Sequence, residues 1–234
     1  MDDQVTHRNT IALGIGYYTV PEASRLLRIP ARNIIRWLAG YRYEQGGHTF
    51  DMPALWSPEL PVTEHHLELS FRDLIELRFV KSFLEAGLGL KTIRDCLEYA
   101  RECVDDSRPF STRRFRTDGR TIFLESAQRK GEAELLDLKR HQYVIKGVIE
   151  RTFKDLDIEE DGVARWRPYR GKQTIVIDPQ RSFGQPIAAR SGVPTIVLFD
   201  AVAAEGSHER VARLFGTTET TVRDAVRFEE SLAA

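Results

Sequence analysis

The feature that most constrains the fold is a pair of short segments with helical apolar spacing between Thr19 and Gly40. Thr19 with Glu22 three residues later is the pattern of a capping box, in which side chains and backbone N–H groups at a helix start satisfy one another. Pro30 ends the first segment, because the residue before a proline is pushed out of the helical region. Gly40 suits the end of the second segment. The sequence therefore predicts two short helices joined by a tight turn.

The second segment divides into two sides. We expect its buried side to hold Ile34, Ile35, Trp37 and Leu38. We expect its exposed side to hold Arg32, Asn33 and Arg36. Residues 17–42 contain five Arg and one Glu, a local charge of +4 that favours a phosphate backbone. This pattern is typical of a helix-turn-helix, whose second helix enters the major groove of DNA. The alternative is an ordinary helical hairpin with a solvated arginine face.

Residues 41–69 predict a hairpin, with a turn at Gly46-Gly47, followed by a proline-rich loop. Ser70 then opens a third helix, LSFRDLIELRFV, and a fourth is expected from Lys91 to Val104. Over residues 1–104 this order resembles the MerR-type winged helix-turn-helix. The resemblance implies that Arg32, Asn33 and Arg36 contact operator DNA and that Arg42 contacts phosphate from the wing.

Residues 105–160 predict a second hairpin and a long helix. Asp118-Gly119 between two strand-like runs is a strong hairpin signal. The arginines around it suit either phosphate contact or the protection of a sheet edge. In the helix from 132 to 156 an apolar seam alternates in steps of three and four residues. We expect this seam to form a homodimer through Leu135, Leu138, Ile145 and Ile149.

After an acidic linker, short strands are expected near 165–168 and 174–177, then helices starting at Pro194-Thr195, at Ser207 and near Thr218. The segment 175–232 resembles a small domain that recurs in bacterial antitoxins. The residues that carry this resemblance are Asp178-Pro179, Gly184-Gln185-Pro186, Gly192-Val193-Pro194, Glu205-Gly206, Val211-Ala212, Ala225 and Phe228. Together with the MerR-like start, the chain resembles a VapB-class antitoxin. Such a protein binds and silences a PIN-domain ribonuclease toxin and represses its own operon.

The resemblance places the toxin-binding surface after about residue 175. A PIN ribonuclease holds its metal with carboxylates, which an inserted arginine can pair with in a bidentate manner. We expect Arg181 and Arg190, beside Gly- and Pro-rich turns, to serve this purpose. An unpartnered surface arginine is the alternative for each.

The 234 residues carry a net charge of −1, so basic surface is expected to be local. No apolar run reaches transmembrane length and no signal peptide pattern is present, which favours a cytoplasmic protein. Cys96 and Cys103 are expected to be free thiols. The motifs of hydrolases, nucleotide-binding loops and metal sites are absent, so neither an enzyme nor a cofactor or metal is expected. A regulator that senses a small molecule remains the alternative function.

The expected fold is mainly α with small β-hairpins: a winged helix-turn-helix plus a small helical, helix-turn-helix-like C-terminal domain. The expected domains are a DNA-binding domain at 1–104, a hairpin and dimerisation helix at 105–160, and an antitoxin-associated domain at 161–234.

Overall fold

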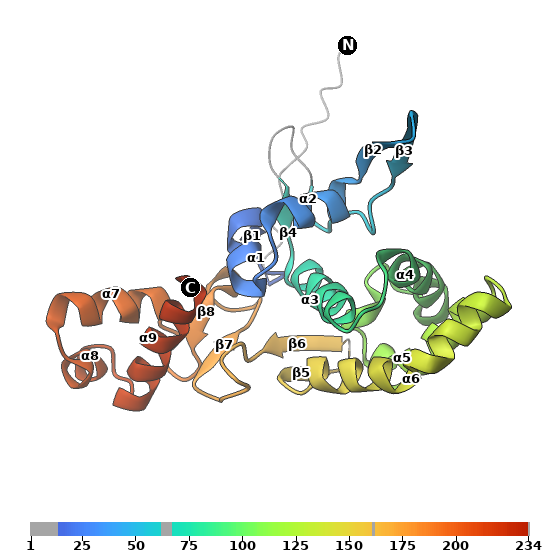
Figure 1. Ribbon diagram of the computed structural model, residues 1–234. Coiled ribbons are helices and arrows are strands. Elements are labelled where there is room, and N and C mark those ends of the chain that lie inside the picture. The colour runs from blue at the N-terminus through green and yellow to red at the C-terminus, as the bar shows by residue number, and fades with distance from the viewer. Residues whose placement is uncertain (1–13, 62–66, 161, 234) are drawn as a thin grey trace, which may run out of the picture.

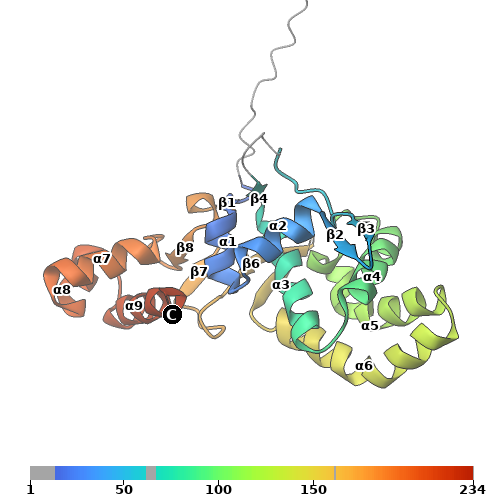
Figure 2. The ribbon, with the colours of Figure 1, turned by 45° about the horizontal axis from the view of Figure 1, so that its top comes forward.

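The computed structural model describes residues 14–61, 67–160 and 162–233, and within them the chain is mainly α-helical with small antiparallel sheets. This confirms the expected mainly α class. In Figure 1 the N-terminal helices and their hairpin lie at the top, and the C-terminal helices lie at one end. The middle helices lie at the other end, an arrangement that the turned view of Figure 2 also shows.

The N-terminal elements are β1 (Tyr18–Thr19), α1 (Val20–Leu27), α2 (Ala31–Ala39), β2 (Tyr41–Gln45), β3 (His48–Met52) and β4 (Glu68–Leu69). The capping box of α1 is present, since Thr19 accepts from the Glu22 amide and Glu22 accepts from the Thr19 amide. The hairpin predicted after Gly40 is confirmed as the antiparallel pair β2–β3. β1 pairs with β4 and so fastens the start of α1 to the start of the third helix.

The middle elements are α3 (Phe71–Glu85), α4 (Leu90–Val104), the 3-10 turn η1 (Pro109–Ser111), α5 (Arg113–Gln128) and α6 (Glu132–Phe153). Their core is aromatic and centred on Phe79, whose ring centroid lies 4.9 Å from that of Phe153 and 5.8 Å from that of Phe110. α3 supplies this core from nearly every side, which explains why its sequence is densely apolar.

The hairpin predicted at Asp118-Gly119 is wrong, because these residues lie inside α5. Thr112 caps this helix by accepting from the amide of Phe115. The glycine has a packing reason instead of a turn: a Cβ at Gly119 would lie 2.9 Å from Cδ1 of Ile149 on α6. The helices α5 and α6 therefore cross closely at Gly119. The surrounding arginines are exposed on a face of α5, so they do not protect the edge of a sheet.

The dimer seam predicted on α6 is also wrong where its side chains are described. Ile145 and Ile149 are buried in the core of their own chain, at 0% and 5% exposure. The three- and four-residue spacing of apolar residues therefore results from packing of α6 against α5 and α3 of the same chain. The side chains of Leu135 and Leu138 lie outside the described part of the structure, although their backbone belongs to α6.

The C-terminal elements are β5 (Leu156–Glu159), β6 (Gly162–Trp166), β7 (Ile175–Ile177), η2 (Ser182–Gly184), β8 (Pro186–Ala188), α7 (Thr195–Glu205), α8 (His208–Leu214) and α9 (Glu219–Ala233). The strands form one antiparallel sheet in the order β5-β6-β7-β8. The boundary expected between 160 and 161 falls inside the β5–β6 hairpin. Trp166 and Ile177 belong to the same core as the N-terminal helices, so the sheet joins the two ends of the chain.

Candidate nucleic-acid and protein interfaces

Helix α2 presents two arginines to solvent on the side opposite its core contacts. Arg32 and Arg36 are exposed and Asn33 is half-buried. Ile35 differs from expectation, because it is 47% exposed. Ile34, Trp37 and Leu38 lie three and four residues apart and fill the buried face, which places Ile35 about 100° further round the helix. The exposed face therefore combines two positive charges with one apolar side chain.

The hairpin β2–β3 continues this face. The guanidinium of Arg36 lies 3.8 Å from the ring centroid of Tyr41, so the end of α2 contacts the first hairpin residue directly. Tyr43 and Phe50 stack with centroids 5.2 Å apart and are 37% and 42% exposed. Exposed aromatic rings beside arginines suit contact with sugars and bases as well as with phosphates.

Arg42 is placed on this hairpin, as expected, but it has a partner. Its Nε donates to Oδ1 of Asp51 at 2.7 Å across the two strands. Both side chains are more than two-thirds exposed, at 72% and 73%, and an ion pair so open to water contributes little. Arg42 can therefore exchange this partner for phosphate, whereas Arg32 and Arg36 have no ion pair within the described residues.

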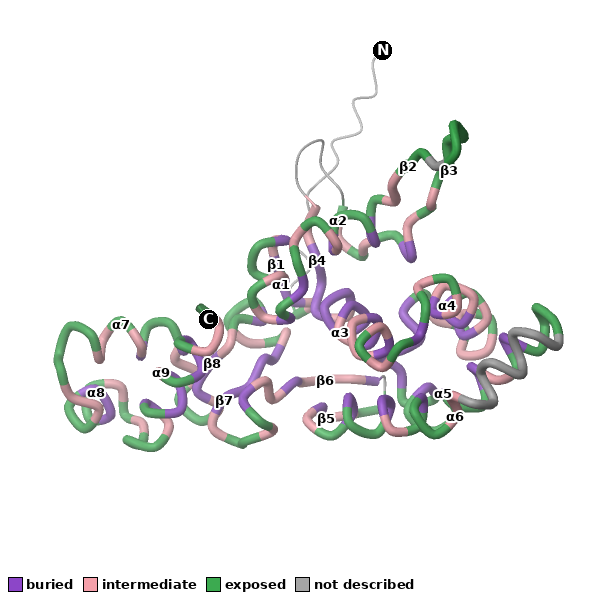
Figure 3. Tube along the Cα trace, viewed as in Figure 1, coloured by how far each residue is buried: buried purple, intermediate pink, exposed green. Residues whose placement is uncertain are grey.

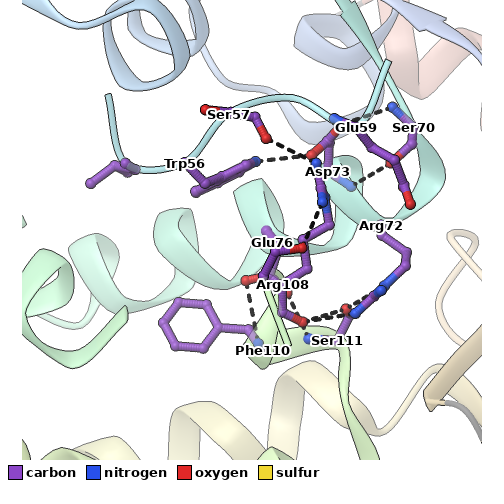
Figure 4. Close-up of polar contacts among 12 residues, drawn as sticks. Trp56, Ser57, Glu59, Ser70, Arg72, Asp73, Glu76, Arg108, Phe110 and Ser111 are labelled. Carbon is purple, nitrogen blue, oxygen red and sulfur yellow. Dashed lines mark hydrogen bonds and ion pairs between the residues drawn. The ribbon is translucent and has the colours of Figure 1, made fainter. Parts of the chain in front are cut away.

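A buried polar cluster fixes the loop that follows the hairpin (Figure 4). Oδ1 of Asp73 accepts from Nε1 of Trp56 at 2.9 Å and from Nε of Arg108 at 2.7 Å. Its other oxygen accepts from the amides of Glu59 and Ser70. The carboxylate is fully buried with four donors around it. Local sequence gives Asp73 only the spacing of a capping residue, three positions after Ser70, because its partner Arg108 lies 35 residues away.

Glu76, one turn along α3, is the second buried acid of Figure 4. Burial raises the pKa of its carboxyl group to about 8, against hydrogen bonds from the amides of Ser111 and Phe110 that lower the pKa. The Ser111 amide donates to Oε1 at 2.8 Å. This acid therefore fastens η1 to α3 and does not reach the surface.

The two arginines expected to contact a protein partner lie at neighbouring turns but differ in exposure. Arg190 is exposed, as expected. Arg181 is half-buried, and its Nη1 donates to the carbonyl oxygen of Ala189 at 2.9 Å. Arg181 therefore holds the turn that presents Arg190, and of these two arginines only Arg190 has no hydrogen bond or ion pair from its guanidinium to any described residue.

Helix α7 is apolar in sequence and yet largely uncovered, a combination the sequence analysis missed. Of its eleven residues only Thr195 and Leu198 are buried. Ile196 and Val197 are each 39% exposed. Figure 3 shows α7 as mostly exposed or intermediate, with little buried surface. An uncovered apolar face of this kind is a candidate binding surface for another protein.

The α8–α9 pair has the outline of a helix-turn-helix, but three of its four arginines already have ion-pair partners. Arg210, Arg213 and Arg223 contact Glu205, Glu209 and Glu219 at 3.3, 2.6 and 2.5 Å. These pairs leave no basic face on α8 of the kind found on α2. Arg227 on α9 is different, because it is exposed and has no ion pair among the described residues.

Both cysteines are free, Cys96 is buried and Cys103 is half-buried. Burial raises the pKa of the Cys96 thiol. Among the described residues no three His, Cys, Asp or Glu side chains gather in a way that could hold a metal ion. Within that same part of the chain no helix combines the length and the apolar character needed to cross a membrane.

Known proteins are similar to this chain over most of its length. No family model matches the sequence. The chain is 28% identical over 221 residues to a protein named putative antitoxin VapB45 from Mycobacterium tuberculosis, a match that covers 89% of this chain and 92% of that protein. The crystal structure of Rv2018 from the same organism has a TM-score of 0.70 at 24% identity, covers 92% of this chain and 98% of its own, and supports the fold alone. Along most of its length the chain is thus similar to a putative VapB-class antitoxin.

Proposed function

We propose that the protein is the antitoxin of a type II toxin–antitoxin system. It binds and silences a PIN-domain ribonuclease through its C-terminal unit, and it represses its own operon by binding DNA through α2 and the β2–β3 hairpin. The observation that carries this proposal is the placement of two different surfaces at separate parts of one fold: the arginine face of α2 and the uncovered apolar face of α7. The similarity to a putative antitoxin supports the same conclusion.

The DNA-binding role rests on Arg32, Asn33 and Arg36. In a helix-turn-helix the N-terminal part of the second helix contacts base edges, and these residues lie in that part of α2 or one turn beyond it. The contact of Arg36 with Tyr41 joins helix and hairpin into a single surface. Binding as a homodimer to two half-sites stays a prediction, and Ile145 and Ile149 are unavailable for its interface because they are buried within their own chain.

The DNA-binding role is tested with a labelled duplex from the region upstream of the gene. Arg32→Ala and Arg36→Ala should each weaken binding by about 1–3 kcal/mol if the side chain contacts a base. Arg213→Ala is the matched control, because Arg213 is an exposed arginine on α8 that pairs with Glu209. If both α2 variants bind as tightly as the unchanged protein, the DNA-binding role is rejected.

The toxin-binding role rests on α7 and Arg190. An apolar contact next to one free arginine matches a ribonuclease whose active site is lined with carboxylates, because the apolar area supplies affinity and the arginine pairs with the acid. Arg181 supports the turn from within the chain. This arrangement accounts for an antitoxin that both holds the enzyme and blocks its metal site.

The toxin-binding role is tested by co-purification with the ribonuclease encoded beside the gene and by inhibition of its RNA cleavage. Val197→Asp and Arg190→Ala should each weaken the complex and restore cleavage. Tyr143→Asp is the control, since Tyr143 is 78% exposed on α6, a helix that lies apart from α7 in Figures 1 and 2. Point variants are needed here, because a truncation after residue 170 would remove Ile177 from the shared core. If Val197→Asp and Arg190→Ala both inhibit RNA cleavage as well as the unchanged protein does, the toxin binds to a different surface.

A further inference from the structure

A groove of about 620 Å³ separates the turn after α1 from the last helix, α9. Its walls come from parts of the chain that are far apart in sequence. It is lined by Leu26, Arg28, Pro168, Tyr169, Arg170, Arg227, Phe228, Glu230, Ser231 and Leu232. Phe228 and Tyr169 form a buried floor, with ring centroids 6.2 Å apart. Figures 1 and 2 both show α9 ending beside α1.

The groove is basic. Three exposed arginines, Arg28, Arg170 and Arg227, line it together with one acid, Glu230. Arg28 is held in place, because its Nη2 donates to the carbonyl oxygen of Ser231 at 2.6 Å. Neither Arg170 nor Arg227 has an ion-pair partner within the part of the chain that the structure describes. Two unpaired guanidinium groups and a third that is fixed beside them suit an anion with several oxygens.

The position of Arg28 relates this groove to the DNA-binding face. Arg28 closes α1 in the left-handed conformation, with φ of 53°, and α2 begins three residues later at Ala31. The N-terminal end of the second helix is the end that enters the major groove. Arginines next to that end are placed for the phosphates that flank the groove, and such contacts hold the protein in register without reading sequence.

We propose that Arg170 and Arg227, together with Arg28, bind the phosphate backbone of DNA beside the site occupied by α2, so that the C-terminal unit takes part in operator binding. This inference rests on the proposed DNA-binding function. Phosphate is favoured over an acidic protein segment because the groove adjoins the α1–α2 turn, whereas the apolar helix α7 and Arg190 contribute no residue to it.

The test is fluorescence anisotropy with two duplexes, one from upstream of the gene and one scrambled duplex of the same length and composition, over a series of salt concentrations. Arg170→Ala and Arg227→Ala should each weaken binding to both duplexes by similar factors. Each should also lower the slope of log affinity against log salt by about 0.9, the value for one phosphate contact. Arg223→Ala is the matched control on the same helix, since Arg223 pairs with Glu219. Circular dichroism confirms that each variant is folded.

The outcomes separate the two proposals. If Arg36→Ala weakens binding but Arg170→Ala and Arg227→Ala leave affinity and salt slope unchanged, the groove does not bind DNA and the proposed function stands. If the unchanged protein binds neither duplex, the DNA-binding function fails and this inference fails with it. A glutamate-rich peptide that binds the unchanged protein but not Arg227→Ala, while DNA binding is the same for both, would assign the groove to a protein partner and overturn the inference.

Discussion

The hydroxyl of Tyr18 donates a hydrogen bond of 2.8 Å to the carbonyl oxygen of Gly184, 166 residues further along the chain. Burial raises the pKa of this hydroxyl, so that it remains a donor at all ordinary pH values. The amide of the neighbouring Tyr17 donates to the carbonyl oxygen of Phe183 at 3.0 Å. The strand that leads into α1 and α2 is therefore fastened to η2, the turn that precedes β8 and the C-terminal helices.

Replacing Gly184 by Ala should destabilise the protein by about 2–4 kcal/mol, from overpacking together with strain at positive φ. A Cβ at this position would lie 2.3 Å from the Tyr18 hydroxyl, and the residue has φ of +81°. Gly206→Ala is the control, since Gly206 also has positive φ but no atom within 4 Å of the added carbon. The urea unfolding midpoint should fall much further for Gly184→Ala than for Gly206→Ala. Equal decreases in the two variants would contradict the close packing of Gly184 against Tyr18.

Replacing Tyr18 by Phe should cost about 1–2 kcal/mol, because the Gly184 carbonyl oxygen would lose a buried donor. Tyr17→Phe provides a control at the adjacent position. The Tyr17 hydroxyl donates to Glu68 at 2.6 Å, but in an exposed position where water can replace it. Thermal unfolding of the two variants should separate them clearly. If Tyr17→Phe lowers stability as much as Tyr18→Phe does, the buried hydrogen bond contributes no more than the exposed one.

Replacing Arg108 by Ala should cost about 3–5 kcal/mol, because it leaves the charge of Asp73 buried without its counter-ion. The side chains of Arg108 and Asp73 are 6% and 0% exposed. Arg129→Ala removes a pair of similar length with Glu102 whose side chains are 59% and 65% exposed, and it should cost no more than about 1 kcal/mol. Chemical unfolding compares the two variants. Near-equal losses would mean that the buried pair contributes no more than a surface pair.

The raised pKa of Glu76 predicts a pH dependence of stability. The folded protein holds the proton up to pH about 8, whereas an unfolded Glu loses it near 4.5. The contribution is therefore fully present below pH 4.5 and is lost as pH rises through about 8. Relative to Glu76→Gln, whose amide does not titrate, the unchanged protein should become less stable between pH 5 and 8.

Urea unfolding of both proteins at several pH values measures this difference. Glu125→Gln serves as the control, since Glu125 accepts a hydrogen bond from Tyr99 in an exposed position. A free-energy difference between the unchanged protein and Glu76→Gln that stays constant from pH 5 to 8 would show that Glu76 titrates as an ordinary acid.

Several elements followed from local sequence alone. The capping boxes of Thr19 with Glu22 and of Ser70 with Asp73 set where α1 and α3 begin, since each box closes within three residues. The hairpin after Gly40 and the exposure of Arg32 and Arg36 follow from turn residues and helical spacing in the same way. These features depend on neighbours along the chain, so the sequence is sufficient to predict them.

Tertiary contacts decided the rest. Asp118-Gly119 carries a hairpin signal, but the burial of Phe115, Ile122 and Phe123 on one side stabilises a helix, and the glycine admits α6 at close range. Arg181 resembles a free surface arginine until the fold brings the Ala189 carbonyl within reach. Tyr18 meets Gly184, and Asp73 meets Arg108, only after segments distant in sequence have packed together. Local propensities amount to fractions of a kcal/mol per residue, whereas burying a large apolar side chain contributes about 1.5–3 kcal/mol, so packing prevails where the two disagree.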